Sequence, residues 1–237
     1  MAQQPAPPPA EEAKVVQVEG MKNPMMHSYR MISAGLDAFE EHHALAPAAP
    51  TLRFRLRQNR QPVGTVSAEP ISLRIVGDGS VDPVVLPVGE DGIVTIPRIG
   101  WAVEQKADLI FNRKKNQVSG MPDVRTPGLP ANARRLGDLR LQCKVLVGML
   151  KSELNIILRA AITTALTSAD WCGSRHLTLM TQAPGMIAEA FLSHGNRSAA
   201  IKFHEDYFDA PIANPDWPDD ALIEVKLTRK VDEVITP

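Results

Sequence analysis

The stretch ISLRIVGDGSVDPVVLPVGEDGIVTIP, residues 71–97, decides the expected fold because three short apolar runs are separated by two glycine-bearing turns. Apolar and polar residues alternate over residues 71–75, which is the period of a strand with one buried face. Glycine reaches backbone angles that other residues avoid, and Asp-Gly between apolar runs is a typical hairpin signal. The stretch therefore predicts three strands, the last of which ends at Pro97.

The strand expected just before this stretch carries a row of arginines. In TLRFRLR, residues 51–57, every second residue from Leu52 is apolar and the residues between are arginines. This alternation predicts one buried face and one basic face. A second basic run begins at Arg113, and we expect it to lie near the first. The candidate binding residues are Arg53, Arg55, Arg57, Arg113, Lys114 and Lys115.

Two helices and a further set of strands complete the expected order. Asn23 followed by Pro24 is typical of a helix start, and apolar residues then recur at helical spacing as far as His43. Alternating apolar residues predict a strand over residues 136–147, and Ser152 is expected to cap a second helix that continues to about Leu166. Before these two elements we expect a strand over residues 101–111 and an irregular loop over 120–133. After them we expect strands over residues 176–180, 186–193, 198–203 and 221–228.

These elements predict an α+β protein, mostly β, with two antiparallel β-sandwich-like modules and two packing helices. The expected organisation is a disordered leader (1–22), a helix plus the first module (23–147), a linking helix plus a smaller β module (148–230), and a tail (231–237).

Composition excludes some classes of function. Apolar residues make up 44% of the 237 residues and charged residues 22%, which is usual for a globular protein. The net charge is −1 and aromatic content is 5%, so the electrostatic and stacking features of a nucleic-acid-binding surface are missing. No apolar run is long enough for a membrane span. Residues 51–145 contain 15 Lys and Arg against 9 Asp and Glu, so the middle of the chain is basic.

The first residues and the two cysteines favour an exported protein. An Ala-Gln junction followed by a proline- and alanine-rich segment resembles the start of a mature periplasmic or secreted chain, and a cytosolic protein with an extended tail is the alternative. Export would make a Cys143–Cys172 disulfide the natural pairing. In the cytosol the two cysteines would be small core residues, and a Cys172–His176 pair would be a conceivable nucleophile.

Ile71 to Pro97 resembles the transthyretin-like or carboxypeptidase-regulatory-like β-sandwich modules of bacterial envelope proteins. The shared pattern is an apolar strand, a Gly-Asp-Gly turn (77–79), another apolar strand, and Glu-Asp-Gly (90–92) leading to a strand and Pro97. Such modules are mostly non-catalytic, so the resemblance implies a binding or structural role and carries over no site residue. The arginine-rich strand stands where that family usually has a glycine-rich one.

The sequence contains no clear catalytic motif. There is no Gly-x-Ser-x-Gly segment, and the adjacent histidines His42 and His43 do not have the spacing of a zinc-binding helix. No cofactor is expected, although an acidic, proline-bearing loop could bind calcium weakly through Asp216, Asp219 and Asp220.

The sequence thus favours a non-catalytic exported binding protein that contacts a protein partner, in the manner of an inhibitor or immunity protein. An anionic envelope polymer is the other candidate partner. The alternative function is a hydrolase whose site combines distant residues such as His176, His194, His204 and the late aspartates.

Overall fold

The computed structural model describes residues 23–59 and 69–228, which form four α-helices and 14 strands. All strand pairs are antiparallel, and the strands form four small sheets with the orders β1-β6-β3-β4, β5-β2-β7, β11-β10-β14-β8 and β12-β13-β9. The chain is therefore α+β with more strand than helix, as the sequence predicted. The expected leader (1–22) and tail (231–237) lie outside the described residues.

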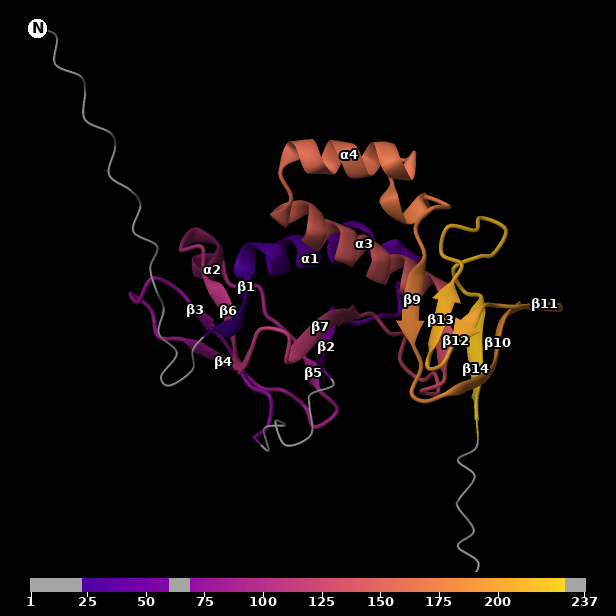
Figure 1. Ribbon diagram of the computed structural model, residues 1–237, viewed down its shortest axis with the longest axis horizontal. Helices are drawn as coiled ribbons and strands as arrows, with labels where there is room; N and C mark the ends of the chain where they lie inside the picture. The colour runs from indigo at the N-terminus through magenta and orange to yellow at the C-terminus, as the bar shows by residue number, and fades with distance from the viewer. Residues whose placement is uncertain (1–22, 60–68, 229–237) are drawn as a thin grey trace, which may run out of the picture.

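The first module comprises strands β1 to β7 and helices α1 and α2 (Figure 1). Their bounds are β1 Pro24–Ser28, α1 Tyr29–Glu41, β2 Arg53–Gln58, β3 Leu73–Val76, β4 Val84–Leu86, β5 Ile93–Val94, α2 Gly100–Glu104, β6 Asp108–Lys114 and β7 Val118–Asp123. The remaining elements are β8 Ala133–Arg135, α3 Leu136–Glu153, α4 Ile156–Leu166, β9 Leu179–Gln182, β10 Ile187–His194, β11 Arg197–Ala200, β12 Phe203–His204, β13 Tyr207–Ala210 and β14 Leu222–Leu227. Short 3-10 helices occupy His43–Leu45 and Trp171–Gly173.

The stretch from Ile71 to Pro97 forms the three expected strands, but they belong to two sheets. β3 pairs with β4 and β6, whereas β5 pairs with β2. The second turn therefore carries the chain from one sheet to the other instead of closing a hairpin. Its Gly92 has a φ of 76°, and a side chain there would place Cβ 2.4 Å from the Leu56 carbonyl oxygen. The two sheets enclose the first hydrophobic core together with α1 and α3.

The first helix begins later than predicted. Residues 24–28 are extended and pair with β6, while Asn23 has a φ of 57°. The helix starts at Tyr29, where the Ser28 hydroxyl oxygen accepts a hydrogen bond from the Met31 amide at 3.2 Å. Pairing with β6 satisfies backbone groups of residues 24–28 that a first helical turn would leave without partners. Proline at the first helical position was thus a misleading signal.

The strand predicted over residues 136–147 is wrong, because this segment is the start of helix α3. Residues two apart on a helix point in directions about 200° apart, so two apolar faces produce an apolar residue at every second position. Leu139 and Cys143 lie in the second hydrophobic core, whereas Leu141 and Val145 lie in the first. The two-residue period here reflects burial on both sides of a helix. The module boundary expected after residue 147 consequently falls within α3.

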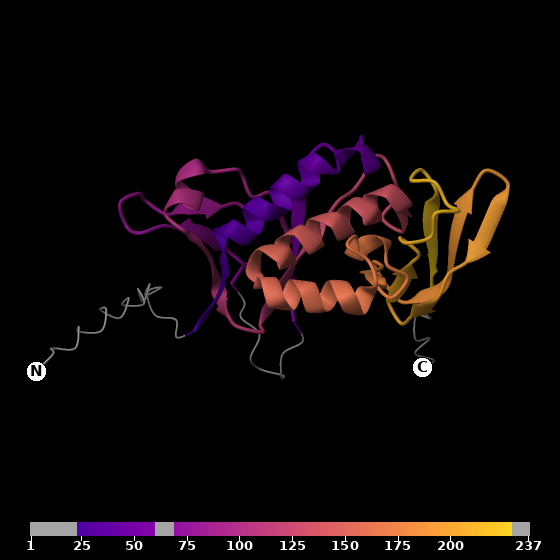
Figure 2. The same cartoon turned by 90° about the horizontal axis from the view of Figure 1, so that it is seen from above.

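Helices α1 and α3 pack closely because two glycines lie at their contact. A Cβ on Gly35 would lie 2.8 Å from Met149 Cγ, and one on Gly148 would lie 2.9 Å from Ala38 Cβ. Side chains at these two positions would separate the helices. Figure 2 shows α3 between α1 and α4, with the sheets of the second module at its N-terminal end.

The disulfide between Cys143 and Cys172 is formed, with the two Cα atoms 6.0 Å apart. It joins α3 to the segment that follows α4. Helix α4 starts at Ile156, with Asn155 as its N-cap, and not at Ser152 as predicted. The Ser152 hydroxyl instead donates to the Met149 carbonyl. No helix in residues 23–59 and 69–228 is both long and apolar enough to cross a membrane.

Three other segments differ from expectation. The strand expected over residues 101–111 begins as helix α2, and only its second half forms β6. The expected loop over residues 120–133 contains the end of β7 and the start of β8. β13, which the sequence did not indicate, pairs with β9 in the second module.

Candidate functional site

The arginine row of β2 forms as the alternating pattern predicted. Leu52, Phe54 and Leu56 are each no more than 5% exposed in the first core. The antiparallel register with β7 sets Arg53 opposite Asp123, Arg55 opposite Met121 and Arg57 opposite Ser119. Directly opposite residues share one face of a sheet. The basic face of β2 therefore includes the Asp123 carboxylate.

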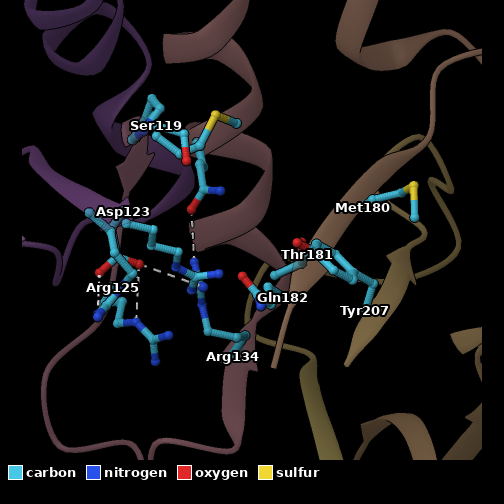
Figure 3. Close-up of a pocket in the computed structure, with 13 residues that line it drawn as sticks. Ser119, Asp123, Arg125, Arg134, Met180, Thr181, Gln182 and Tyr207 are labelled. Atoms are coloured by element: carbon cyan, nitrogen blue, oxygen red, sulfur yellow. Dashed lines mark hydrogen bonds and ion pairs between the residues drawn. The ribbon is translucent and has the colours of Figure 1, made fainter. Parts of the chain in front are cut away.

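This face forms one wall of a cleft between the two modules, with a volume of about 180 Å³. β9 and β13 supply the opposite wall, and β8 and α3 close the inner end. Figure 3 shows Asp123, Arg125 and Arg134 on one side and Met180, Gln182 and Tyr207 on the other. The lining residues are Arg55, Arg57, Ser119, Met121, Pro122, Asp123, Arg125, Arg134, Gln142, Met180, Thr181, Gln182 and Tyr207.

Asp123 lies among four guanidinium groups. Its Oδ2 is 3.1 Å from a terminal nitrogen of Arg55 and 3.7 Å from one of Arg53. Its Oδ1 is 3.2 Å from Nε of Arg125 and 3.7 Å from a terminal nitrogen of Arg134. One carboxylate thus holds together four cations that come from three separate segments of the chain.

The pKa of Asp123 follows from these neighbours. Burial alone would raise the pKa of the carboxyl group, because a low-dielectric site disfavours its charged form. Arg134, Arg125 and Arg55 outweigh burial and bring the pKa below its ordinary value. Asp123 is therefore a fixed anion at neutral pH and is poorly suited to accept or donate a proton.

Arg134 is the deepest cation of the cleft, at 6% exposed. Burial lowers its pKa to about 10, so it still carries its charge at neutral pH. One terminal nitrogen donates to the Val124 carbonyl and to Gln142 Oε1, both at 2.9 Å. Among the described residues its Nε has no hydrogen-bond partner, and neither has the buried Thr181 hydroxyl on the opposite wall. Unpaired buried polar atoms are costly and uncommon in native proteins.

Arg57 is the exposed cation at the mouth of the cleft. Its pKa is lowered by partial burial and by the like charge of Arg55. In the described part of the chain the Arg57 guanidinium makes no hydrogen bond or ion pair, although the nearby carboxylates of Asp123 and Asp206 favour its protonated form. Arg57 is therefore available to an incoming acidic group.

The second basic run does not join this cleft. Arg113 is 3% exposed, and its guanidinium donates to the carbonyl oxygens of Asn112 and Glu69. Lys114 and Lys115 are exposed where β6 turns into β7 and do not line the cleft. The site instead uses Arg125 and Arg134, which sequence reasoning missed. Arg125 lies in the segment predicted as a loop (120–133) and Arg134 directly follows that segment, and no periodicity there shows which way a side chain points.

The acidic loop contacts basic side chains of the protein itself. Asp219 accepts from Arg140 at 2.5 Å, and Asp220 lies 3.3 Å from His194 Nε2. The Asp216 carbonyl accepts a hydrogen bond from Arg197. In residues 23–59 and 69–228 no group of three or more His, Cys, Asp or Glu side chains could hold a metal ion. The arrangement gives no support to the expected weak calcium site.

The histidines expected for a hydrolase also lie at separate places. His194 ends β10 beside Asp220, and His204 is exposed next to Glu205. His176 follows the disulfide, so Cys172 offers it no thiol. His43, in the 3-10 helix that follows α1, is half-buried against Phe39 and bonds to the Ala49 carbonyl at 2.8 Å.

Comparison with protein-family models, with curated proteins and with solved structures gives no match to this chain. The resemblance of Ile71–Pro97 to transthyretin-like modules stays a prediction, and the site has to be interpreted from its own geometry.

Proposed function

We propose that the chain is a non-catalytic, exported binding protein in which the cleft between the two modules holds an acidic group of a protein partner. The observation that carries the proposal is the set of four arginines that line a cleft of about 180 Å³ together with a single carboxylate, Asp123. Arginine side chains in and beside the cleft outnumber the nearby carboxylates. The five arginines are Arg53, Arg55, Arg57, Arg125 and Arg134, and the three carboxylates are those of Asp123, Asp138 and Asp206. The cleft therefore has a surplus of positive charge.

The chemistry of the cleft suits a carboxylate. Guanidinium groups bind carboxylates through two parallel hydrogen bonds, and they are weakly hydrated, so they lose little on entering an interface. Within residues 23–59 and 69–228, Arg57 at the mouth makes no ion pair, and Nε of Arg134 and the Thr181 hydroxyl, further in, have no hydrogen-bond partner. An acidic side chain would add anionic charge beside these cations and could supply acceptors to their donors.

The lining residues favour binding over catalysis. They comprise arginines, amides, hydroxyls, methionines and a proline, with no histidine and no cysteine. The one carboxylate is held ionised by its neighbours, so it is not poised near neutral pH as a general acid or base would be. The disulfide suits an oxidising compartment, which is consistent with a periplasmic or secreted location.

Titration of the full chain with a blocked hexaglutamate peptide tests the proposal. Calorimetry should detect binding that weakens as salt is added, because exposed charge interactions are screened. Arg57→Gln should weaken the affinity about tenfold, the effect of losing one charge-assisted hydrogen bond. Arg57 is the best position for this change, since it forms no ion pair with any residue that the structure describes.

Arg30→Gln is the matched control, because Arg30 is exposed on α1 and pairs with Glu153 away from the cleft. It should leave the affinity unchanged. Equal losses for Arg30→Gln and Arg57→Gln, or no binding by the wild-type chain at low salt, would contradict the proposal. Binding of an anionic polysaccharide but not of the peptide would replace the protein partner by an envelope polymer.

A further inference from the structure

A second cavity, lined almost entirely by apolar side chains, lies on the other face of the sheet that carries the arginines. Its volume is about 160 Å³, and α1, α3 and the sheet strands enclose it. The lining includes Phe54, Leu56, Leu109, Phe111, Leu146 and Leu150. An apolar cavity of about 150 Å³ in another protein stays dry and accepts a molecule as large as benzene. This cavity is therefore large enough for one apolar side chain.

The apolar cavity reaches the protein surface between α3 and β7. Leu150 is 46% exposed, Gly120 is exposed, and Leu146 is half-buried, although all three line the cavity. Gly120 has no side chain to close the opening. The cavity is therefore open to the surface at this point.

The same strands line both cavities with alternate residues. On β2, Arg55 and Arg57 face the cleft, whereas Phe54 and Leu56 face the apolar cavity. On β7, Pro122 lines both. The charged site and the apolar site are thus separated by the thickness of one sheet and meet at its edge.

A single row of side chains on helix α3 passes from the inner end of the arginine cleft to the opening of the apolar cavity. Gln142 lines the arginine cleft, and Leu146 and Leu150 line the apolar cavity. Residues four apart lie on one face of a helix, about 6 Å apart along its axis. An extended segment that follows this row would reach from one cavity to the other within two or three residues, at about 3.3 Å each. Met121, 45% exposed in the cleft lining, adds apolar surface beside Pro122.

We infer that the two cavities form one composite site for a peptide segment in which an acidic residue is followed or preceded, within about three residues, by leucine or phenylalanine. The acidic side chain occupies the arginine cleft and the apolar side chain occupies the cavity beside Leu146 and Leu150. This inference rests on the proposed function, since it assumes a protein partner with an acidic group. It adds the second contact that gives the segment its specificity, because charge alone discriminates poorly among acidic sequences.

Blocked peptides with one Glu and one Leu, separated by zero to three alanines, test the inference on the full chain. Two further peptides replace either the Leu or the Glu by Ala. The best Glu–Leu spacing should bind at least tenfold more tightly than the peptide with Glu alone, the gain expected from burying a leucine side chain. Leu150→Ser, at the exposed mouth, should remove most of this gain and leave the affinity for the Glu-only peptide unchanged.

Ile156→Ala is the matched control, since Ile156 is an exposed apolar residue of α4 that does not line the cavity. It should leave the gain intact. Val94→Phe, which fills the cavity from inside, gives a second test, with its fold checked by circular dichroism. Contacts between peptide leucine methyls and Leu146 in an NMR spectrum would place the side chain directly.

The outcomes separate the inference from the proposed function. Equal binding of the Glu–Leu and Glu-only peptides would overturn the composite site and leave the arginine cleft as the binding site. Binding of the Leu-only peptide that equals that of the Glu–Leu peptide and is insensitive to Arg57→Gln would also overturn it. Failure of every peptide to bind would remove the proposed function as well.

Discussion

Helices α3 and α4 follow one another in the chain, are both rich in apolar residues, and have opposite environments. α3 has nine buried residues, and its two faces contribute to both hydrophobic cores. α4, with the sequence IILRAAITTAL, has none, and Ile156 and Ile157 are 82% and 78% exposed. Apolar composition alone therefore does not decide burial in this protein, because a helix is buried only where other elements supply a complementary surface.

Polar contacts rather than apolar packing hold α4 in place. Thr163 Oγ1 accepts from the Trp171 indole at 2.9 Å, and the Ser174 hydroxyl donates to the Leu166 carbonyl at 2.6 Å. Asn155 caps the first turn, and Thr167 ends the helix with a φ of 53°. The disulfide then ties the following segment to α3. Helix α3 therefore organises the fold through its buried side chains, whereas α4 is held by contacts at its two ends.

The largest expected effect is on α3. Leu139→Ala and Leu141→Ala should each lower the free energy of unfolding by about 2–5 kcal/mol, because each leaves a cavity in a closed core. Both leucines are 0% exposed, one in each core. Urea denaturation of each variant measures the loss. A loss from one substitution only would show that a single core, and not both, depends on α3.

Removal of the disulfide is expected to have the next largest effect. The double variant Cys143→Ala/Cys172→Ala should be less stable by about 2–4 kcal/mol, since the bridge restricts the unfolded chain. Hydrogen exchange should also become faster in α4 than in the first half of α3, because α4 loses its covalent tie. Reductant should destabilise the wild-type chain and leave the double variant unchanged. Equal hydrogen-exchange protection of α4 with and without the disulfide would show that the disulfide does not hold α4 in place.

A smaller, pH-dependent effect is expected in the cleft beside α3. The arginines hold the pKa of Asp123 below its ordinary value. At a pH between the two pKa values, Asp123 is therefore ionised in the folded chain and protonated in the unfolded chain. The stability from Asp123 is present above the ordinary aspartate pKa of about 4 and is lost as pH falls through the lower folded value. The gap in unfolding free energy between wild type and Asp123→Asn should therefore narrow from pH 6 to pH 3.

Thr163→Val is the control for this titration. It removes the bond from the Trp171 indole to α4, which involves no ionisable group. Its effect on the unfolding free energy should stay constant over the same pH range. A constant gap for Asp123→Asn would show that the carboxylate gains no net stabilisation from the arginines.

The smallest effect is expected on α4. Ile156→Ala and Ile157→Ala should change the unfolding free energy by less than about 0.5 kcal/mol, because little buried surface is lost and alanine favours helix. Thermal and urea unfolding, compared with Leu139→Ala, give the measurement. A loss near that of the α3 variants would mean that α4 is covered in solution.

The sequence anticipated features that depend on local periodicity or on simple pairing. Alternation in residues 51–57 predicted both the buried face and the arginine row of β2, and the Cys143–Cys172 pairing is formed. Alternation of apolar residues gave the wrong prediction for α3, because burial of both helix faces also places an apolar residue at every second position. It failed again at Asn23, where pairing with β6 outweighed a favourable helix-start signal.

By itself the sequence determined the α+β class and the arginine-bearing strand and favoured the disulfide, since each depends on the order of residues within a short segment or on the only two cysteines. Tertiary structure alone decided which cations share the cleft. Arg55 and Arg134 are far apart in the chain and meet only because β2 and β8 lie on either side of Asp123. Charges act through space and impose no period on the sequence, so the position of the site could be known only after the two modules were placed around α3.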